Sequence, residues 1–266
     1  MLYEMRMARQ ILRREGLASC ARRTWHYIYK WPSYLLFAMK MMRLNSGCGL
    51  DLHKWVNFAF TGYSNLIMPL QIRSEILQLL DSIQSRPPKY ILEIGTSNGG
   101  TLFLLSRVAT EDACVISIDL PLGPYGGGYP AWKRLFYKSF ARKDQVIRLI
   151  RADSHEPVAQ KKVEAILQAN RIDLLFIDGD HTYEGVRADF EMYEPFVKEG
   201  GMIVFHDIVS HRWEHDCGVD RFWDEIRNSH EHLEFIENPN QGWAGLGLIL
   251  KGGSVKSTPS MGAISS

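Results

Sequence analysis

The sequence has few cysteines and lacks any long hydrophobic run. Its 266 residues include four cysteines, and no two of them have the CxxC spacing of a zinc knuckle or a redox pair. A disulfide framework is therefore not predicted, and we expect the reducing cytoplasm as the location. No stretch reaches the roughly 18 consecutive apolar residues of a membrane span, and the first residues lack the apolar run of a signal peptide.

An excess of charge of one sign is also missing. The formal net charge is +1, and no basic run with interleaved aromatic residues appears in the central part of the chain. Such a chain has no overall field that would draw it to nucleic acid, so we expect no nucleic-acid partner. Because 45% of the residues are apolar, the chain can bury one substantial core, and we expect one catalytic domain with appendages.

Residues 1–43 are the exception to this balanced charge. They hold nine Lys or Arg against two Glu, and residues 31–42 are apolar with several aromatic side chains. We therefore predict a basic helical arm or lid over residues 1–60. One interpretation places it on the cytoplasmic face of an anionic membrane. The interpretation we favour packs it on its own domain or on a second copy of the chain, since basic amphipathic patterns are common on ordinary helices.

Apolar runs of strand length alternate with helix-length segments in the rest of the chain. A helical pattern from about residue 67 ends before Pro87 and Pro88, which cannot continue a helix. The runs that follow cover residues 90–94, 114–118, 146–150, 174–177, 202–205 and 246–250. This alternation predicts an α/β fold with a doubly wound, mostly parallel, seven-stranded Rossmann-like sheet, helices on both faces and an N-terminal helical extension. We assign residues 61–251 to this domain and residues 252–266 to a disordered tail.

A glycine-rich turn follows the first run, where ligands of such sheets gather. Its candidate cofactor-binding residues are Glu93, Gly95, Thr96, Ser97 and Gly99. Glycines let the backbone approach a ligand, and the start of the next helix offers free N–H groups, which suits a nucleotide-type cofactor. The spacing is not the GxGxxG of dinucleotide sites, and Glu93 would repel a pyrophosphate while accepting hydrogen bonds from an ammonium group. The alternative is a turn that serves only strand-to-helix packing.

Polar residues also follow the second and third runs. Asp119 ends the second run, where a carboxylate can accept both hydroxyls of a ribose, and Asp153 with Ser154 follows the third, where they can meet an adenine edge. Together with the turn, these residues resemble the class I S-adenosylmethionine-dependent methyltransferases. The resemblance implies S-adenosylmethionine as the cofactor and methyl transfer as the reaction. A nicotinamide-dependent dehydrogenase is the enzyme class we expect least.

A second group of polar residues follows the fourth and fifth runs. Asp178, His206 and Asp207 could supply oxygen and imidazole ligands to a divalent ion, which would lower the pKa of a substrate hydroxyl. Asp180 or His181 would then be the general base. The alternatives are that the two aspartates near residue 179 cap the next helix and that the histidines are ordinary buried residues.

These residues carry a closer resemblance. The segments FIDGDHTYEGVRADFEMYEPFVKEGGMIVFHD and GVDRFWDEI are similar to methyltransferases grouped with the cephalosporin hydroxylase-like and macrocin-type sugar O-methyltransferases, over roughly residues 65 to 250. The resemblance implies a sugar-like, natural-product or glycan hydroxyl as acceptor. In metal-dependent relatives an Asp and an acidic pair bind Mg²⁺, which corresponds to Asp178, His206 and Asp207 here. The histidine departs from that pattern, so metal dependence stays open.

Two other functions and several loop and tryptophan residues remain to be considered. The rival functions are an O-methyltransferase for a small aromatic diol, and an inactive cofactor-binding scaffold at a membrane. Residues 121–130, rich in Gly and Pro, are a candidate lid or a plain surface connection. We expect solvated loop positions for His211, His215 and Asp216, and core or pocket-wall positions for Trp213, Trp223 and Trp243.

Overall fold

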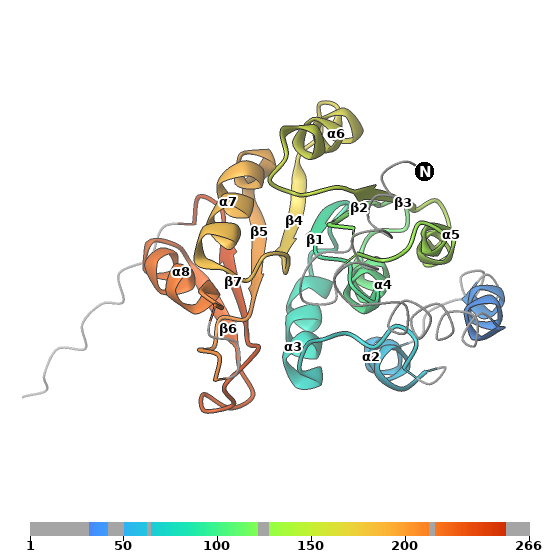
Figure 1. Ribbon diagram of the computed structural model, residues 1–266, viewed down its shortest axis with the longest axis horizontal. Coiled ribbons are helices and arrows are strands. Elements are labelled where there is room, and N and C mark those ends of the chain that lie inside the picture. The colour runs from blue at the N-terminus through green and yellow to red at the C-terminus, as the bar shows by residue number, and fades with distance from the viewer. Residues whose placement is uncertain (1–31, 42–50, 63–64, 122–127, 213–215, 254–266) are drawn as a thin grey trace, which may run out of the picture.

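The structure is a computed structural model that describes residues 32–41, 51–62, 65–121, 128–212 and 216–253 (Figure 1). Most of the predicted basic arm, the centre of the 121–130 loop and the tail after residue 253 lie outside the described residues. Trp213 and His215 lie outside them as well.

A seven-stranded sheet forms the centre of the domain, in the order β3-β2-β1-β4-β5-β7-β6. The strands are β1 (Tyr90–Ile94), β2 (Cys114–Asp119), β3 (Val146–Arg151), β4 (Ile172–Ile177), β5 (Val197–His206), β6 (His232–Phe235) and β7 (Leu246–Leu250). The first five are parallel, and β7 is antiparallel to β5 and β6. The predicted fold class is confirmed. Every predicted run is a strand, whereas β6 has no apolar run to mark it because three of its four residues are exposed.

Helices cover both faces of this sheet (Figure 1). They are α2 (Leu52–Thr61), α3 (Arg73–Gln84), α4 (Gly100–Val108), α5 (Lys133–Lys138), α6 (Pro157–Leu167), α7 (Tyr183–Tyr193) and α8 (Val219–Ile226), with the short turns η1 (Glu194–Phe196) and η2 (Arg227–Ser229). One buried apolar cluster packs helices α2, α3, α4 and α5 on one face of the sheet. A second packs helices α6, α7 and α8 on the other face. Alternating strand side chains feed both clusters, as expected of a sheet covered on two sides.

Part of the predicted arm packs on the domain itself. Residues 32–41 are helical, and Tyr34, Phe37 and Met41 on one face are buried. The Phe37 ring lies 5.0 Å from that of Phe136 on α5 and 6.2 Å from that of Phe103 on α4, measured between centroids. For these residues the favoured interpretation, packing on the chain's own domain, is what the structure shows. Among the described residues, no helix is both long enough and apolar enough to cross a membrane.

The order of the strands positions the functional site. The chain passes outward from β1 to β2 and β3, then returns to place β4 on the other side of β1. Loops at the carboxyl ends of β1 and β4 therefore separate and leave a crevice, which is where open α/β sheets bind ligands. Two backbone hydrogen bonds fix this edge, from Gly95 N to Ile118 O and from Asp178 N to Ile94 O, both 2.9 Å long.

Candidate active site

A cavity of about 440 Å³ opens at this crevice, a volume typical of a small-molecule site. Of the predicted site residues, all but Glu93 and Gly99 line it. Those that do are Gly95, Thr96, Ser97, Asp119, Asp153, Ser154, Asp178, Asp180, His181, His206 and Asp207. The structure thus brings both predicted groups, the cofactor-binding residues and the Asp and His residues, into one space.

The glycines of the turn serve close packing as well as the cavity. Gly95 has φ +95°, and a Cβ there would lie 1.8 Å from the carbonyl oxygen of Asp178. Gly99 has φ +84° and sits beneath the wall, where a Cβ would lie 2.5 Å from the ring of Tyr137. Both positions combine the left-handed region with a close neighbour, so only glycine fits. Packing explains Gly99 fully, while Gly95 both packs and lines the cavity.

Glu93 is fully buried behind the turn. The Ser117 hydroxyl donates a hydrogen bond to its Oε2, and the Thr96 hydroxyl lies 2.5 Å from that of Ser117. Oε1 is buried with no hydrogen-bond partner among the described residues. Burial raises the pKa of Glu93 well above its usual range, although the Ser117 hydroxyl acts to lower it. A buried acceptor without a partner is costly and calls for a donor.

Asp119 lies on the cavity wall at the end of β2. Its Oδ2 accepts hydrogen bonds from the backbone N–H groups of Gly128, at 3.1 Å, and Tyr129, at 3.4 Å. Burial raises the pKa of Asp119 to about 6, and these two hydrogen bonds oppose that rise. The carboxyl therefore titrates close to neutral pH, where a change in its charge would affect a bound ligand.

A partly buried ion pair beside Asp153 was not predicted from the sequence. His155 lines the cavity, and its Nε2 lies 3.3 Å from Oδ1 of Asp189, a fully buried residue of α7. The hydrogen bond with Asp189 raises the pKa of His155 to about 9, while burial opposes the rise. Asp153 itself accepts from the His155 N–H at 2.9 Å, and the Ser154 carbonyl accepts from the Tyr193 hydroxyl at 2.7 Å. Only the approach of α7 to this loop reveals the pair.

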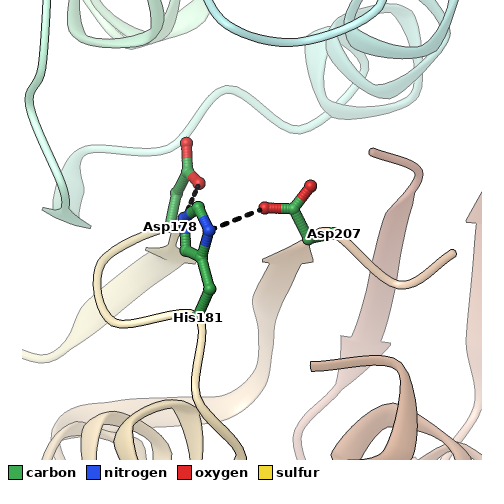
Figure 2. A group of neighbouring side chains, drawn as sticks. All are labelled: Asp178, His181 and Asp207. Carbon is green, nitrogen blue, oxygen red and sulfur yellow. Dashed lines mark ion pairs between the residues drawn. The ribbon is translucent and has the colours of Figure 1, made fainter. Parts of the chain in front are cut away.

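Two carboxylates and an imidazole meet on another part of the cavity wall, which begins at Asp178 beside the turn. His181 lies between Asp178 and Asp207, with its Nε2 3.6 Å from Asp178 Oδ1 and its Nδ1 3.4 Å from Asp207 Oδ2 (Figure 2). One ligand atom from each residue lies within 4.8 Å of the others, so the three could hold a metal ion. We call these three residues the Asp–His cluster. The predicted ligand set had His206 in place of His181.

His206, which is almost fully buried in the cavity wall, contacts both carboxylates of the Asp–His cluster. Its Nδ1 lies 3.1 Å from Asp178 Oδ1 and 3.0 Å from Asp207 Oδ2. Burial acts to lower the pKa of His206, but the carboxylates of Asp207 and Asp178 more than offset it, so the pKa lies well above its usual range. Burial likewise acts to raise the pKa of Asp207, but His206 holds it well below its usual range.

His211 is a second support, contrary to the expectation of a solvated loop position. Its Nε2 donates to Asp207 Oδ1 at 2.8 Å, and its side chain is 8% exposed. The hydrogen bond with Asp207 raises the pKa of His211 to about 10. Asp216 is exposed as expected, Trp223 lies in the core, and Trp243 lines the cavity.

Segments outside the predicted motifs complete the site. Gln71 donates to Asp178 Oδ2 at 2.8 Å and accepts from the Thr101 hydroxyl at 2.8 Å. The Ala244 N–H donates to Asp207 Oδ1 at 3.1 Å. A glutamine within the apolar stretch before α3 was the available sequence signal for the first contact. A backbone donor such as Ala244 carries no signal in the sequence.

The alternative of helix capping applies to neither aspartate directly. The N-cap residue of α7 is Thr182, whose hydroxyl accepts from the Gly185 N–H at 3.0 Å. Asp180 accepts from the Thr182 N–H at 2.9 Å and so orders the turn before the helix while it lines the cavity. Asp178 makes its contacts with Gln71 and the histidines.

Comparisons with known proteins agree with this arrangement. The sequence profile of a family described as Methyltransferase domain matches residues 92–208, a range that runs from β1 past β5 and contains both ends of the cavity. An uncharacterized protein of Acanthamoeba polyphaga mimivirus is 54% identical over 138 residues, which are 52% of this chain and 60% of that protein. An uncharacterized protein of Sinorhizobium fredii is 29% identical over 170 residues, which are 62% of this chain and 17% of that protein. The chain therefore spans less than two thirds of either relative.

Solved structures with a similar fold include three that hold a cofactor. An O-methyltransferase from Bacillus cereus in complex with SAH has a TM-score of 0.50 and 18% identity, and the match covers 76% of this chain and 92% of that one. The O-methyltransferase TomG from Streptomyces achromogenes, involved in tomaymycin synthesis and in complex with SAM, has a TM-score of 0.50 and 15% identity over 77% and 91%. Cofactor-bound Rv0187 from MTB has a TM-score of 0.51 and 16% identity over 83% and 90%.

At such identities these likenesses establish the fold, and the sequence match names the domain. Residues 92–208 are thus similar in sequence to a methyltransferase domain, the class of domain that the sequence predicted.

Proposed function

We propose that the chain is an S-adenosylmethionine-dependent O-methyltransferase that acts on a hydroxyl of a small-molecule or glycan acceptor. One observation carries the proposal: the glycine turn with Asp119 and the Asp–His cluster line a single cavity. The first group suits a nucleoside cofactor, and the second can take a proton from a hydroxyl. A methyl transfer to oxygen needs both functions within reach of each other.

The turn end of the cavity, residues 95–97 with Asp119, fits S-adenosylmethionine. When bound, this cofactor supplies an electrophilic methyl group on a sulfonium. The orphaned Glu93 Oε1 fits a cofactor that brings an ammonium group to this end. Asp119 would accept hydrogen bonds from the ribose hydroxyls, and Asp153 with Ser154 would meet the adenine edge.

The Asp–His cluster fits a divalent ion through its donor set. Two carboxylates and an imidazole lie close enough to share one ion, and an imidazole ligand suits Fe²⁺, Ni²⁺ or Zn²⁺ better than Mg²⁺. An ion bound there would lower the pKa of the acceptor hydroxyl. His206 would then act from beneath the cluster by orienting the two carboxylates, whose oxygens it approaches at 3.1 Å and 3.0 Å.

Two versions of proton removal are open to these side chains. With an ion, His181 is a ligand, and Asp180 is the carboxylate that remains to accept the proton. Without an ion, His181 is the base, and the flanking carboxylates of Asp178 and Asp207 stabilise the imidazolium that forms. In both versions the residues at the carboxyl ends of β4 and β5 do the acid–base work.

Transfer of a radiolabelled methyl group by the full chain tests the function. The acceptor panel holds monosaccharides and aromatic diols, and each is assayed with EDTA, Mg²⁺, Mn²⁺ or Zn²⁺. We expect transfer to a hydroxyl oxygen. Comparison of the rates with EDTA and with each metal ion decides between the two versions of proton removal. Binding of S-adenosylhomocysteine without turnover on any acceptor or metal would favour an inactive scaffold. Loss of cofactor binding itself would contradict the proposal.

The acceptor class has two candidates. The resemblance to sugar O-methyltransferases favours a sugar-like hydroxyl. An aromatic diol is favoured by the apolar side chains of Met68, Leu70 and Trp243, which line the cavity that holds the Asp–His cluster.

We also propose peripheral contact with an anionic membrane through the outer face of the helix at residues 32–41. Leu35, Leu36 and Met39 on that face are 43–57% exposed, and the segment belongs to the basic part of the sequence. Apolar insertion and charge attraction add together at a lipid surface. Cosedimentation with phosphatidylserine vesicles should fall when Leu36→Asn is introduced, and Leu233→Asn, at an exposed leucine of β6, is the control. Equal cosedimentation with neutral vesicles would contradict the idea.

A further inference from the structure

Two large apolar side chains stay exposed where the cavity opens. Leu70 is 47% exposed and Trp243 is 40% exposed, and both line the cavity. Single apolar residues scattered on a surface need no explanation. Two that share the wall of one cavity differ, because together they leave apolar area in water where a ligand can contact it. We call Leu70 and Trp243 the mouth pair.

Each residue of the mouth pair is next in sequence to a residue that donates a hydrogen bond to one carboxylate of the Asp–His cluster. Leu70 precedes Gln71, whose amide donates to Asp178 Oδ2 at 2.8 Å. Trp243 precedes Ala244, whose N–H donates to Asp207 Oδ1 at 3.1 Å. Each apolar side chain therefore stands one residue from a direct contact with a carboxylate that would activate the acceptor.

The loop that carries Trp243 has a firmly specified conformation. Gly242, Ala244 and Gly245 have φ values of +76°, +61° and +84°, so the backbone around the indole turns through the left-handed region three times. A non-glycine residue such as Ala244 adopts this region only when its surroundings hold it there. The loop therefore holds the Trp243 indole in a defined position.

A buried carboxylate of α3 holds the same loop in place. Glu75 is fully buried, and its Oε1 accepts from the Glu237 N–H at 3.0 Å and the Gln241 Nε2 at 2.7 Å. Its Oε2 accepts from the Gly245 N–H at 3.0 Å. The Gln241 amide also donates to the Trp243 carbonyl at 2.8 Å. These bonds fix the backbone on both sides of the indole.

The segment that carries Leu70 is anchored as well. A Cβ on Gly100 would lie 2.2 Å from the carbonyl oxygen of Ile67 and 2.6 Å from the nitrogen of Pro69, so the start of α4 packs tightly on this segment. Gln71 is held between Thr101 and Asp178. Both members of the mouth pair therefore belong to rigid walls.

The chemistry of these walls selects one kind of acceptor. Met68, Pro69, Leu70 and Trp243 offer dispersion contacts and a flat indole face, while Gln71 already donates to Asp178. A sugar ring needs several donors and acceptors around it, whereas a flat apolar ring is held by aromatic and aliphatic side chains. We propose, building on the proposed function, that the mouth pair holds the aromatic ring of a phenolic or catechol-type acceptor.

The transfer to such an acceptor balances without any further reactant. A bond forms between the phenolic oxygen and the methyl carbon of S-adenosylmethionine. The bond between that carbon and the sulfonium breaks, and its electron pair stays on sulfur to give S-adenosylhomocysteine. The hydroxyl proton passes to Asp180 when an ion occupies the Asp–His cluster, or to His181 when none does.

Titration calorimetry on the full chain, saturated with S-adenosylhomocysteine in the presence of Mn²⁺, tests the mouth pair. The probes are catechol and methyl glucopyranoside. We expect catechol to bind the wild type at least about tenfold more tightly than the glucoside. Trp243→Ala should weaken catechol binding about 30-fold and Trp243→Phe should restore part of the loss, because a buried aromatic contact dominates such sites. Leu70→Ala should weaken it less, and Leu135→Ala, at an exposed leucine of α5, is the matched control.

The outcomes separate this inference from the proposed function. Unchanged affinity of every variant for S-adenosylhomocysteine shows that the domain is folded and the cofactor end intact. Three results would contradict only the role of the mouth pair in holding an aromatic ring. They are equal affinities for the glucoside and catechol, a catechol affinity that Trp243→Ala does not change, and no catechol binding by the wild type. Failure of S-adenosylhomocysteine to bind the wild type would instead overturn the proposed function.

Discussion

The two ends of the cavity are stabilised by different forces. At the turn end, residues 95–97 come from one short stretch after β1, and backbone geometry and close packing determine their positions. At the cluster end, Asp178, His181 and Asp207 come from two strand ends, and ion pairs with His206 and His211 hold them. We therefore expect a substitution at the turn end to lower mainly the stability of the fold. A substitution at the cluster end should lower mainly the rate of catalysis.

Replacement of the central histidine should have the largest effect. His181→Gln removes the base, or one metal ligand, while the position stays polar. We expect kcat to fall by about 10² to 10⁴-fold, the usual contribution of a general acid or base. Affinity for S-adenosylhomocysteine should not change, because the turn end is untouched. Steady-state kinetics and calorimetry on the same preparation measure both quantities.

His53→Gln is the matched control, since His53 is exposed on α2. A kcat for His181→Gln within the range of that control would remove His181 from the chemistry. A joint loss of kcat and cofactor affinity would show that the two ends are not separable in the way the contacts suggest.

A methyl group added to the turn should act on stability first. Gly95→Ala combines φ +95° with a Cβ placed 1.8 Å from the Asp178 carbonyl oxygen, so the turn or β4 must shift. We expect the free energy of unfolding to fall by about 3 kcal/mol or more, from backbone strain and overpacking together. Urea unfolding followed by circular dichroism measures it. Gly200→Ala, with φ +69° and no atom within 4 Å of the added Cβ, isolates the strain and should cost about 1 kcal/mol. Equal losses of unfolding free energy for the two variants would show that the close approach to Asp178 adds nothing to the backbone strain.

The residues that could be predicted are those that strand ends place. Asp119 and Asp178 directly follow buried runs, so the parallel sheet alone brings them to one edge. The place of His181 beside the two carboxylates could not be predicted, because it depends on how the loop after β4 turns back over them. Gln71 and Trp243 come from loops without periodicity, and their places depend on packing against α3 and α4. Fold and strand-end chemistry thus follow from local pattern, whereas the walls follow from tertiary contacts.

Acidic pH should weaken cofactor binding through the turn end. Burial raises the pKa of Asp119 to about 6, and the ribose hydroxyls need its charged form as acceptor. As pH falls from 7 to 5, protonation removes the binding form, so affinity for S-adenosylhomocysteine should drop about tenfold. Calorimetry across this range measures the drop. Asp119→Asn should bind weakly with a flat profile, and a variant profile as steep as that of the wild type would assign the titration to another group.

The pair of His155 and Asp189 should give the smallest effect, at alkaline pH. The hydrogen bond with Asp189 raises the pKa of His155 from 6.5 to about 9, so protonation favours the folded state. This stabilisation is fully present below pH 6.5 and is lost as pH rises through 9. We expect a loss of about 1 kcal/mol or less, because the imidazole is partly exposed to solvent. Urea unfolding between pH 7 and pH 10 should show the loss in the wild type and not in His155→Gln. A parallel decline in both proteins would assign the alkaline loss to a titrating group other than His155.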